Sequence, residues 1–212
     1  MSPKAFEIAA NETEAIILDV RHQSEFVKSH IPNSIFIGID GGFAPWVGAL
    51  VKDVKQPLLL ITAEGRLEET IVRLSRVGFD NALGYLEGGF EAWQADGKEV
   101  DSIETISAQD FAELTNKEEL HVLDVRKEGE FESSHISNAE NTPLSNLNDY
   151  LSQFKTEGTN YTHCAGGYRS VIANSILKSR GIHNVIDVLG GFGAIKKTDI
   201  EITNFVCPST LK

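Results

Sequence analysis

The chain has 212 residues and an ordinary globular composition, 41% hydrophobic and 24% charged, which suits two domains of about 100 residues each. Its formal net charge of −12 disfavours binding to nucleic acid or to a membrane surface, because phosphate groups would repel it. No run approaches the roughly 20 apolar residues of a membrane span, and residues 1–10 lack a basic segment followed by an apolar one, so we expect a cytoplasmic protein.

An internal repeat determines the predicted domain organisation. Residues 18–21 read Leu-Asp-Val-Arg and recur at 123–126, and the Glu-Phe and Ser-His-Ile segments that follow recur at the same spacing. A Gly-Gly-Phe segment closes each copy. The polar, glycine-containing segment 96–102 separates the copies, as linkers do. We therefore predict two domains, residues 1–100 and residues 101–212.

In the first copy, short apolar segments alternate with helical patterns. The predicted strands are residues 15–20, 34–39, 57–62 and 82–86. Apolar strands of this length, separated by helices, are typical of a parallel sheet that is covered by helices on both faces. Gly78 follows a helical stretch at 67–77 and is expected to end it in the left-handed conformation. In the glycine-rich segment 41–48, Phe43 and Trp46 are expected to pack in the core or between the domains.

The second copy repeats this order. Its predicted strands are residues 120–125, 160–164 and 184–188. Ser107 begins a Ser-x-x-acid segment, which caps helix starts, so a helix is predicted early in this copy. A second helical stretch, 170–180, ends at Gly181 as its counterpart ends at Gly78. A single large doubly wound domain is the alternative, and the repetition of whole motifs disfavours it.

The segment 161–170 carries the strongest chemical signal in the sequence. Cys164 ends a predicted strand and faces the start of a helix, where unpaired N–H groups and the helix dipole favour an anion. Gly166 and Gly167 can adopt positive φ angles and turn successive amides inward, and Arg169 adds a planar positive group. Such surroundings favour the thiolate form of a cysteine. The alternative is a buried structural cysteine before a glycine turn.

Together, the Asp-Val-Arg, Glu-Phe, Ser-His-Ile, Cys-Ala-Gly-Gly-Tyr-Arg-Ser and Gly-Gly-Phe segments resemble the rhodanese family. The resemblance covers both halves and implies two tandem rhodanese-like domains of the α/β class, each with a central parallel sheet flanked by helices. It also implies a sulfurtransferase, in which Cys164 takes a sulfane sulfur from thiosulfate or a persulfide donor and passes it to a thiol or another thiophilic acceptor. The substrate-binding loop of the family maps onto Ala165, Gly166, Gly167, Tyr168 and Arg169.

Several polar residues are assigned by their position in the repeat or in the family. Asp124 and Arg126 match the family's pair at the end of a strand, and they are expected either to support the loop or to form a surface ion pair. His135 repeats His30 of the other copy, which indicates a structural role in both copies. His163 precedes the nucleophile and is interpreted either as a strand residue or as a modifier of the thiolate.

The first copy departs from the family pattern. Its corresponding loop, residues 61–66, reads Ile-Thr-Ala-Glu-Gly-Arg, and the copy contains no cysteine. Without a thiol no persulfide can form, and Glu64 places a negative charge where an anion should bind. We therefore predict a catalytically silent domain that serves packing or partner recognition. A silent copy before an active one also resembles the C-terminal part of fusions with an N-terminal metallo-β-lactamase-fold persulfide dioxygenase, so such a domain is an expected partner in a longer protein.

Two other functions stay open. Cysteine phosphatases and arsenate reductases combine a thiolate with an amide cradle and an arginine, but they resemble Cys-x5-Arg, whereas Cys164 and Arg169 form Cys-x4-Arg. A non-catalytic module that binds a partner or senses redox state is the other alternative. Cys207 is expected to be inert, with sulfur relay or a disulfide to Cys164 as alternatives. Two cysteines are too few for a zinc site built on cysteine pairs, and no metal or cofactor is expected.

Overall fold

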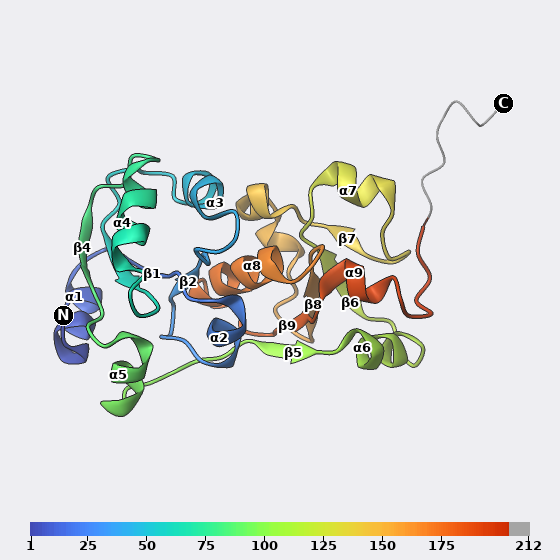
Figure 1. Ribbon diagram of the computed structural model, residues 1–212. Coiled ribbons are helices and arrows are strands. Elements are labelled where there is room, and N and C mark those ends of the chain that lie inside the picture. Colours follow the sequence, from blue (N-terminus) through green and yellow to red (C-terminus); the bar gives the residue numbers. More distant parts are fainter. Residues whose placement is uncertain (204–212) are drawn as a thin grey trace. The chain divides into compact units, whose positions relative to one another are not determined.

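A computed structural model describes residues 1–203 of the chain. The chain divides into two units (Figure 1). The first comprises Met1–Ile103 with Lys178–Arg180, and the second comprises Glu104–Leu177 with the residues from Gly181 onward. Each unit contains one parallel sheet flanked by helices, which confirms the predicted α/β class. Among the described residues, no helix has the length and apolar character that a membrane crossing requires.

The first unit has a four-stranded parallel sheet with the strand order β2-β1-β3-β4. The strands are β1 (Ile16–Asp19), β2 (Ile35–Phe36), β3 (Leu58–Ile61) and β4 (Ala82–Tyr85). The helices are α1 (Pro3–Glu12), α2 (Gln23–Lys28), α3 (Phe43–Leu50), α4 (Leu67–Ser75) and α5 (Gly89–Ala95). Each strand lies inside a predicted one, so the apolar pattern located this sheet correctly.

Strand β2 is shorter than the apolar pattern around it. Beyond β2, the Ile37 and Ile39 N–H groups still donate to the carbonyl oxygens of Asp19 and Val20 at the end of β1. Beyond β2, the chain therefore stays beside the end of β1, but isolated hydrogen bonds hold it there instead of the regular ladder of a sheet. Apolar character extends over the whole segment because both isoleucines are buried.

The glycine-rich aromatic segment of the first unit folds into α3, which the sequence pattern does not predict. Glycine disfavours helix interiors, and this segment contains three glycines in eight residues, 41–48. Burial provides the stabilisation that intrinsic propensity does not, because Phe43 and Val47 are fully buried on one face of the helix. The predicted packing role of Phe43 is confirmed, and Trp46 is half-buried.

The second unit has a five-stranded parallel sheet with the order β5-β9-β8-β6-β7. The strands are β5 (Glu104–Ile106), β6 (His121–Asp124), β7 (Glu140–Asn141), β8 (Asn160–His163) and β9 (Val185–Val188). The α-helices are α6 (Ala108–Thr115), α7 (Glu128–Ser133), α8 (Tyr168–Ser179) and α9 (Gly191–Ile195), and Leu144–Gln153 forms 3-10 turns.

The two edge strands, β5 and β7, lack the apolar pattern and are not predicted from the sequence. Both present exposed polar residues, since an edge strand has a neighbour on one side only. The helix that follows β5 begins as predicted, because the Ser107 hydroxyl accepts a hydrogen bond from the Asp110 N–H at 3.1 Å. The glycines predicted to end helices, Gly78 and Gly181, have φ angles of +87° and +84°.

Strand β8 lies at the centre of the second sheet, and its side chains alternate between two helical layers. Tyr161 packs with Phe111 of α6 in a core cluster on one face. On the other face, the Thr162 hydroxyl donates to the Asn174 side chain of α8 at 2.9 Å. Because side chains alternate along a strand, Cys164, two residues after Thr162, is directed toward α8 at the end of the strand.

Candidate active site

Cys164 lies in the loop between the end of β8 and the start of α8. Its sulfur accepts a hydrogen bond from the Gly167 N–H, with 3.1 Å between nitrogen and sulfur, and the Ser170 hydroxyl oxygen lies 3.6 Å from the same sulfur. Gly167 has a φ angle of +100°, as predicted, whereas Gly166 does not adopt a positive φ. The Gly167 amide of the loop and the Ser170 hydroxyl of α8 are therefore both directed at the sulfur.

The residues of the loop differ in their exposure to solvent. Cys164 is only 1% exposed, and Gly167 is buried, while Ala165 and Gly166 are exposed to solvent. Tyr168 is half-buried and begins α8. Cys164 is thus buried, whereas the next two residues, Ala165 and Gly166, form an exposed rim.

A glycine motif distant in sequence anchors the backbone of this loop. The Phe192 N–H donates to the Cys164 carbonyl at 2.6 Å, and the Gly193 N–H donates to the Ala165 carbonyl at 2.9 Å. The approach is so close that a Cβ atom on Gly191 would lie 2.4 Å from the Cys164 carbonyl oxygen. Only glycine fits at this position, so the closing Gly-Gly-Phe of the second copy fixes where Cys164 lies.

Gly191→Ala is therefore expected to displace the Cys164 loop and to lower any reaction at the sulfur by at least about tenfold, equivalent to about 1.4 kcal/mol. The matched control is Gly181→Ala, because Gly181 has a φ angle of +84° but open space around its Cβ position. Both variants carry the left-handed strain of about 1 to 2 kcal/mol, and only the first clashes with the loop. Steady-state rates of the two folded variants test this, and equal rates would refute the anchoring role.

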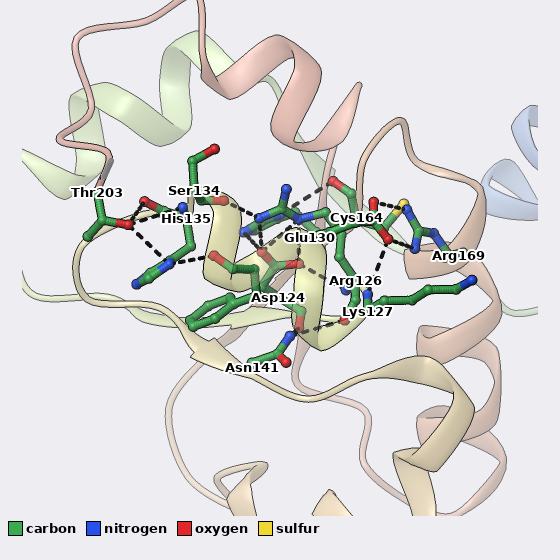
Figure 2. A network of polar contacts seen from close by, with 12 residues as sticks. Asp124, Arg126, Lys127, Glu130, Ser134, His135, Asn141, Cys164, Arg169 and Thr203 are labelled. Carbon is green, nitrogen blue, oxygen red and sulfur yellow. Dashed lines mark hydrogen bonds and ion pairs between the residues drawn. The ribbon is translucent and has the colours of Figure 1, made fainter. Parts of the chain in front are cut away.

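Arg169 forms an ion pair with Glu130 of α7 beside the loop (Figure 2). Both terminal nitrogens of the guanidinium donate to the carboxylate, at 2.6 and 2.9 Å. Hydrogen bonds from Arg169 hold the pKa of Glu130 below its ordinary value, and the same hydrogen bonds raise the pKa of Arg169. The positive charge predicted for this loop is thus present, and in this structure a carboxylate engages it.

Glu130 is a site residue that the sequence analysis missed. It belongs to the repeated Glu-Phe segment, which marked it as part of the common framework and not of the loop. In the first unit, the arginine that follows the loop, Arg66, pairs with Asp40 and Glu69 instead of with Glu25. The pairing with a glutamate of the preceding helix is therefore a feature of the second copy.

Asp124 and Arg126 form a buried ion pair, so the alternative of a surface pair is wrong. The two side chains are 0% and 5% exposed, and the guanidinium reaches a carboxylate oxygen at 2.6 Å. The same guanidinium lies 3.9 Å over the Phe192 ring and donates to the Ser134 carbonyl. Because the Phe192 N–H holds the Cys164 carbonyl, the pair supports the loop through Phe192.

The two histidines of the second copy have different surroundings. His163 is fully buried, its Nδ1 lies 3.3 Å from the Cys164 carbonyl oxygen, and burial lowers its pKa. Its ring lies parallel to Phe192, on the face of β8 opposite to α8. His135 stacks on Phe131 and its Nδ1 contacts the Phe131 carbonyl, as His30 does with Phe26 in the first unit. These matching contacts indicate a structural role for His135.

The sequence profile of the family described as rhodanese-like domain matches residues 2–96 and again residues 107–198. The chain belongs to the rhodanese-like domain family. The two matches together cover most of the chain, and they confirm the prediction of tandem domains.

Individual rhodanese relatives align with about half of the chain. The uncharacterized protein YqhL of Bacillus subtilis is 32% identical over 90 residues, which are 42% of this chain and 70% of that protein. The thiosulfate sulfurtransferase GlpE of Coxiella burnetii is 29% identical over 87 residues, 41% of this chain and 81% of that protein. Among solved structures, a rhodanese-related protein of Thermoplasma volcanium is 29% identical with a TM-score of 0.43, covering 47% of this chain and 97% of that one.

Within the first rhodanese-like unit, Thr62 occupies the position of Cys164. Strand registers establish the equivalence, since Ile61 pairs with Asp19 as His163 pairs with Asp124. The arginine of the loop follows Thr62 by four positions, at Arg66, whereas Arg169 follows Cys164 by five. The loop after Thr62 borders a cavity of about 820 Å³ whose lining includes three carboxylates, Glu25, Glu64 and Glu91.

Residues 1–203 contain no group of three or more histidine, cysteine, aspartate or glutamate side chains placed to hold a metal ion. Cys207 lies outside the described residues, so its predicted inertness stays a prediction. The groups described at the site are the Cys164 sulfur, the Gly167 amide, the Ser170 hydroxyl and the ion pair of Arg169 with Glu130.

Proposed function

We propose that this chain is a sulfurtransferase that carries a sulfane sulfur as a persulfide on Cys164. The observation that supports it most is the position of the Cys164 sulfur at the end of β8, with the Gly167 N–H directed at it. Thiosulfate or a persulfide is the proposed donor, and a thiol or another thiophilic molecule is the proposed acceptor. Membership of the rhodanese-like family and similarity to a thiosulfate sulfurtransferase support the same reaction class.

In the first half-reaction, the Cys164 thiolate attacks the outer sulfur of thiosulfate. A new S–S bond forms, the S–S bond of thiosulfate breaks, and sulfite leaves with the bonding electron pair. Total charge is conserved, because a thiolate and a dianion become a persulfide anion and sulfite. In the second half-reaction, the acceptor attacks the terminal sulfur of the persulfide, and the Cys164 thiolate leaves and is regenerated.

Each charged species in this cycle needs local stabilisation, because the chain as a whole carries a net charge of −12. The Gly167 N–H and the start of the twelve-residue helix α8 favour an anion at the sulfur. Arg169 supplies the full positive charge that an anionic donor requires. We propose that the donor takes the place of Glu130 at the guanidinium, and that this exchange accompanies opening of the rim at Ala165 and Gly166.

Mass spectrometry of the intact protein after exposure to sulfur donors tests the proposal. The expected result is a gain of one sulfur atom that maps to the peptide containing Cys164 and is removed by cyanide or a thiol. The donor that loads the protein fastest identifies the substrate class. A gain confined to peptides without Cys164 would contradict the proposal.

A second candidate is a non-catalytic module that binds a partner, with Cys164 as a redox-sensitive or structural thiol. The 1% exposure of Cys164 favours it, because an inert thiol is commonly buried. Peptide-resolved alkylation of the native protein discriminates between the two candidates. Modification of Cys164 at the rate of a free thiolate supports sulfur transfer, and protection until the protein unfolds supports the non-catalytic module.

We also propose that the first unit is catalytically silent, for two reasons beyond the missing thiol. The spacing from Thr62 to Arg66 is one residue shorter than the spacing from Cys164 to Arg169, and Glu64 adds a negative charge there. Thr62→Cys in a Cys164→Ser background is therefore expected to produce no thiocyanate from thiosulfate and cyanide. A rate above that of the Cys164→Ser parent would show that the thiol alone was missing.

A further inference from the structure

A buried carboxyl group lies beneath the loop, between the second sheet and α8. Asp187, in the middle of β9, is 1% exposed, and its Oδ1 has no hydrogen-bond partner. The Ser170 hydroxyl is the hydrogen-bonding group that faces this carboxyl group. A carboxylate removed from water is unfavourable unless it is paired or fully hydrogen-bonded, so the half-satisfied Asp187 requires an explanation.

The side chains around Asp187 provide no compensating charge. Its register partners on the neighbouring strands are Thr105 of β5 and Thr162 of β8, and α8 contributes Ser170 and Asn174. All four are uncharged. Burial therefore dominates and raises the pKa of Asp187 to about 7, while the hydrogen bond from Ser170 acts in the opposite direction.

Ser170 connects this carboxyl group to the sulfur of Cys164. Its hydroxyl oxygen lies 3.6 Å from the sulfur and is also hydrogen-bonded to Asp187. A hydroxyl group has one proton and can donate it to only one partner at a time. The direction of the hydrogen bonds at Ser170 therefore depends on which of its two neighbours is ionised.

We propose that Cys164 and Asp187 share one proton through Ser170, which makes Asp187 a positioning residue for the sulfur transfer proposed above. In one state, the protonated Asp187 donates to Ser170, and Ser170 donates to the Cys164 thiolate. In the other, the thiol donates to Ser170, and Ser170 donates to the Asp187 carboxylate. The two states differ by the transfer of one proton and have the same total charge.

The first of these states suits the reaction. The thiolate attacks the donor while Asp187 keeps the proton, so the buried cluster carries a single negative charge. Formation of the persulfide moves that charge outward to the terminal sulfur and leaves the proton where it was. When the acceptor takes the terminal sulfur, the thiolate returns to its hydrogen bond with Ser170. Simultaneous ionisation of both groups is disfavoured by their mutual repulsion.

The pH dependence of iodoacetamide alkylation, followed on the peptide that contains Cys164, tests the shared proton. In the wild type, the thiolate is expected to appear in two steps separated by at least about one pH unit, as coupled groups titrate. Asp187→Asn is expected to reduce this to one step. Thr162→Val is the matched control, because it removes a hydroxyl from the same cluster without touching Ser170, and it should keep both steps. A single step in the wild type that Asp187→Asn leaves unchanged would overturn the proposal.

A second measurement needs no substitution of Asp187, in case that variant fails to fold. The carboxyl carbon of Asp187 is followed by NMR across the same pH range, before and after carboxamidomethylation of Cys164. The expected change is from a two-step titration to a single step, since the alkylated sulfur cannot ionise. Identical curves for the two forms refute the shared proton. Neither measurement requires sulfur transfer, so a protein that shares the proton but forms no persulfide would count against the proposed function alone.

Discussion

Cys164→Ser should lose persulfide formation and should lower thiocyanate production from thiosulfate and cyanide by at least about a thousandfold. A serine hydroxyl cannot accept a sulfane sulfur, and its alkoxide is far less accessible than a thiolate at neutral pH. The substitution is nearly isosteric at a site that is 1% exposed, so the fold should be retained. Initial rates of thiocyanate release, measured with equal concentrations of folded protein, provide the comparison.

Cys207→Ser is the matched control for this loss, since it removes the only other thiol in the chain. It is expected to keep the wild-type rate and the persulfide on the Cys164 peptide. The opposite pattern, with activity retained by Cys164→Ser and lost by Cys207→Ser, would show that the nucleophile has been assigned to the wrong cysteine.

Arg169→Ala should lower kcat/KM for thiosulfate by about 10-fold to 100-fold. Hydrogen bonds to a charged group contribute about 1.5 to 3 kcal/mol, and their loss corresponds to a decrease in this range. Two effects add in this variant. The donor loses its positive partner, and the Glu130 carboxylate, released from its 2.6 and 2.9 Å contacts, adds repulsion near the sulfur. A sulfane-sulfur donor that carries no charge should be affected much less, because it does not require the guanidinium. Parallel steady-state kinetics with the two donors measures the difference.

Glu130→Gln separates the two effects. It keeps a side chain of the same size but removes the charge that competes with the donor for Arg169, so KM for thiosulfate should fall. In the double variant with Arg169→Ala, part of the loss should be recovered, because the residual carboxylate is gone. Raised ionic strength should weaken thiosulfate use by the wild type more than by Arg169→Ala. An unchanged KM for thiosulfate in Arg169→Ala would exclude Arg169 from donor binding.

The contrast between the two units follows from a few positions in an otherwise repeated framework. Both copies keep the buried Asp-Val-Arg ion pair, with the arginine over the phenylalanine of Gly-Gly-Phe, at 4.1 Å in the first unit and 3.9 Å in the second. What differs is the loop. A Cβ on Gly89 of the first unit would lie 3.6 Å from the Thr62 carbonyl oxygen, an ordinary contact, whereas Gly191 approaches Cys164 too closely for any side chain. The framework alone therefore does not place a nucleophile.

Much of the architecture and the chemistry of the loop could be predicted from the sequence, because both depend on local patterns. Apolar segments of strand length located all four strands of the first sheet and the three inner strands of the second, and the repeat divided the chain into two copies. A cysteine between a strand and a helix start, followed by glycines and an arginine, indicated an anion site at Cys164. The edge strands of the second sheet, β5 and β7, were not predicted, because their short sequences, Glu-Thr-Ile and Glu-Asn, carry no apolar pattern.

Only the tertiary structure decided which distant groups meet at that sulfur. It brought Glu130 to Arg169, the carbonyl of Cys164 to Gly191, and Asp187 to Ser170. An aspartate inside an otherwise apolar strand was the one local signal for Asp187, and it did not indicate a partner. Periodicity states which face of a strand or helix is buried, but the neighbours on that face depend on strand order and helix placement, which are set by long-range packing.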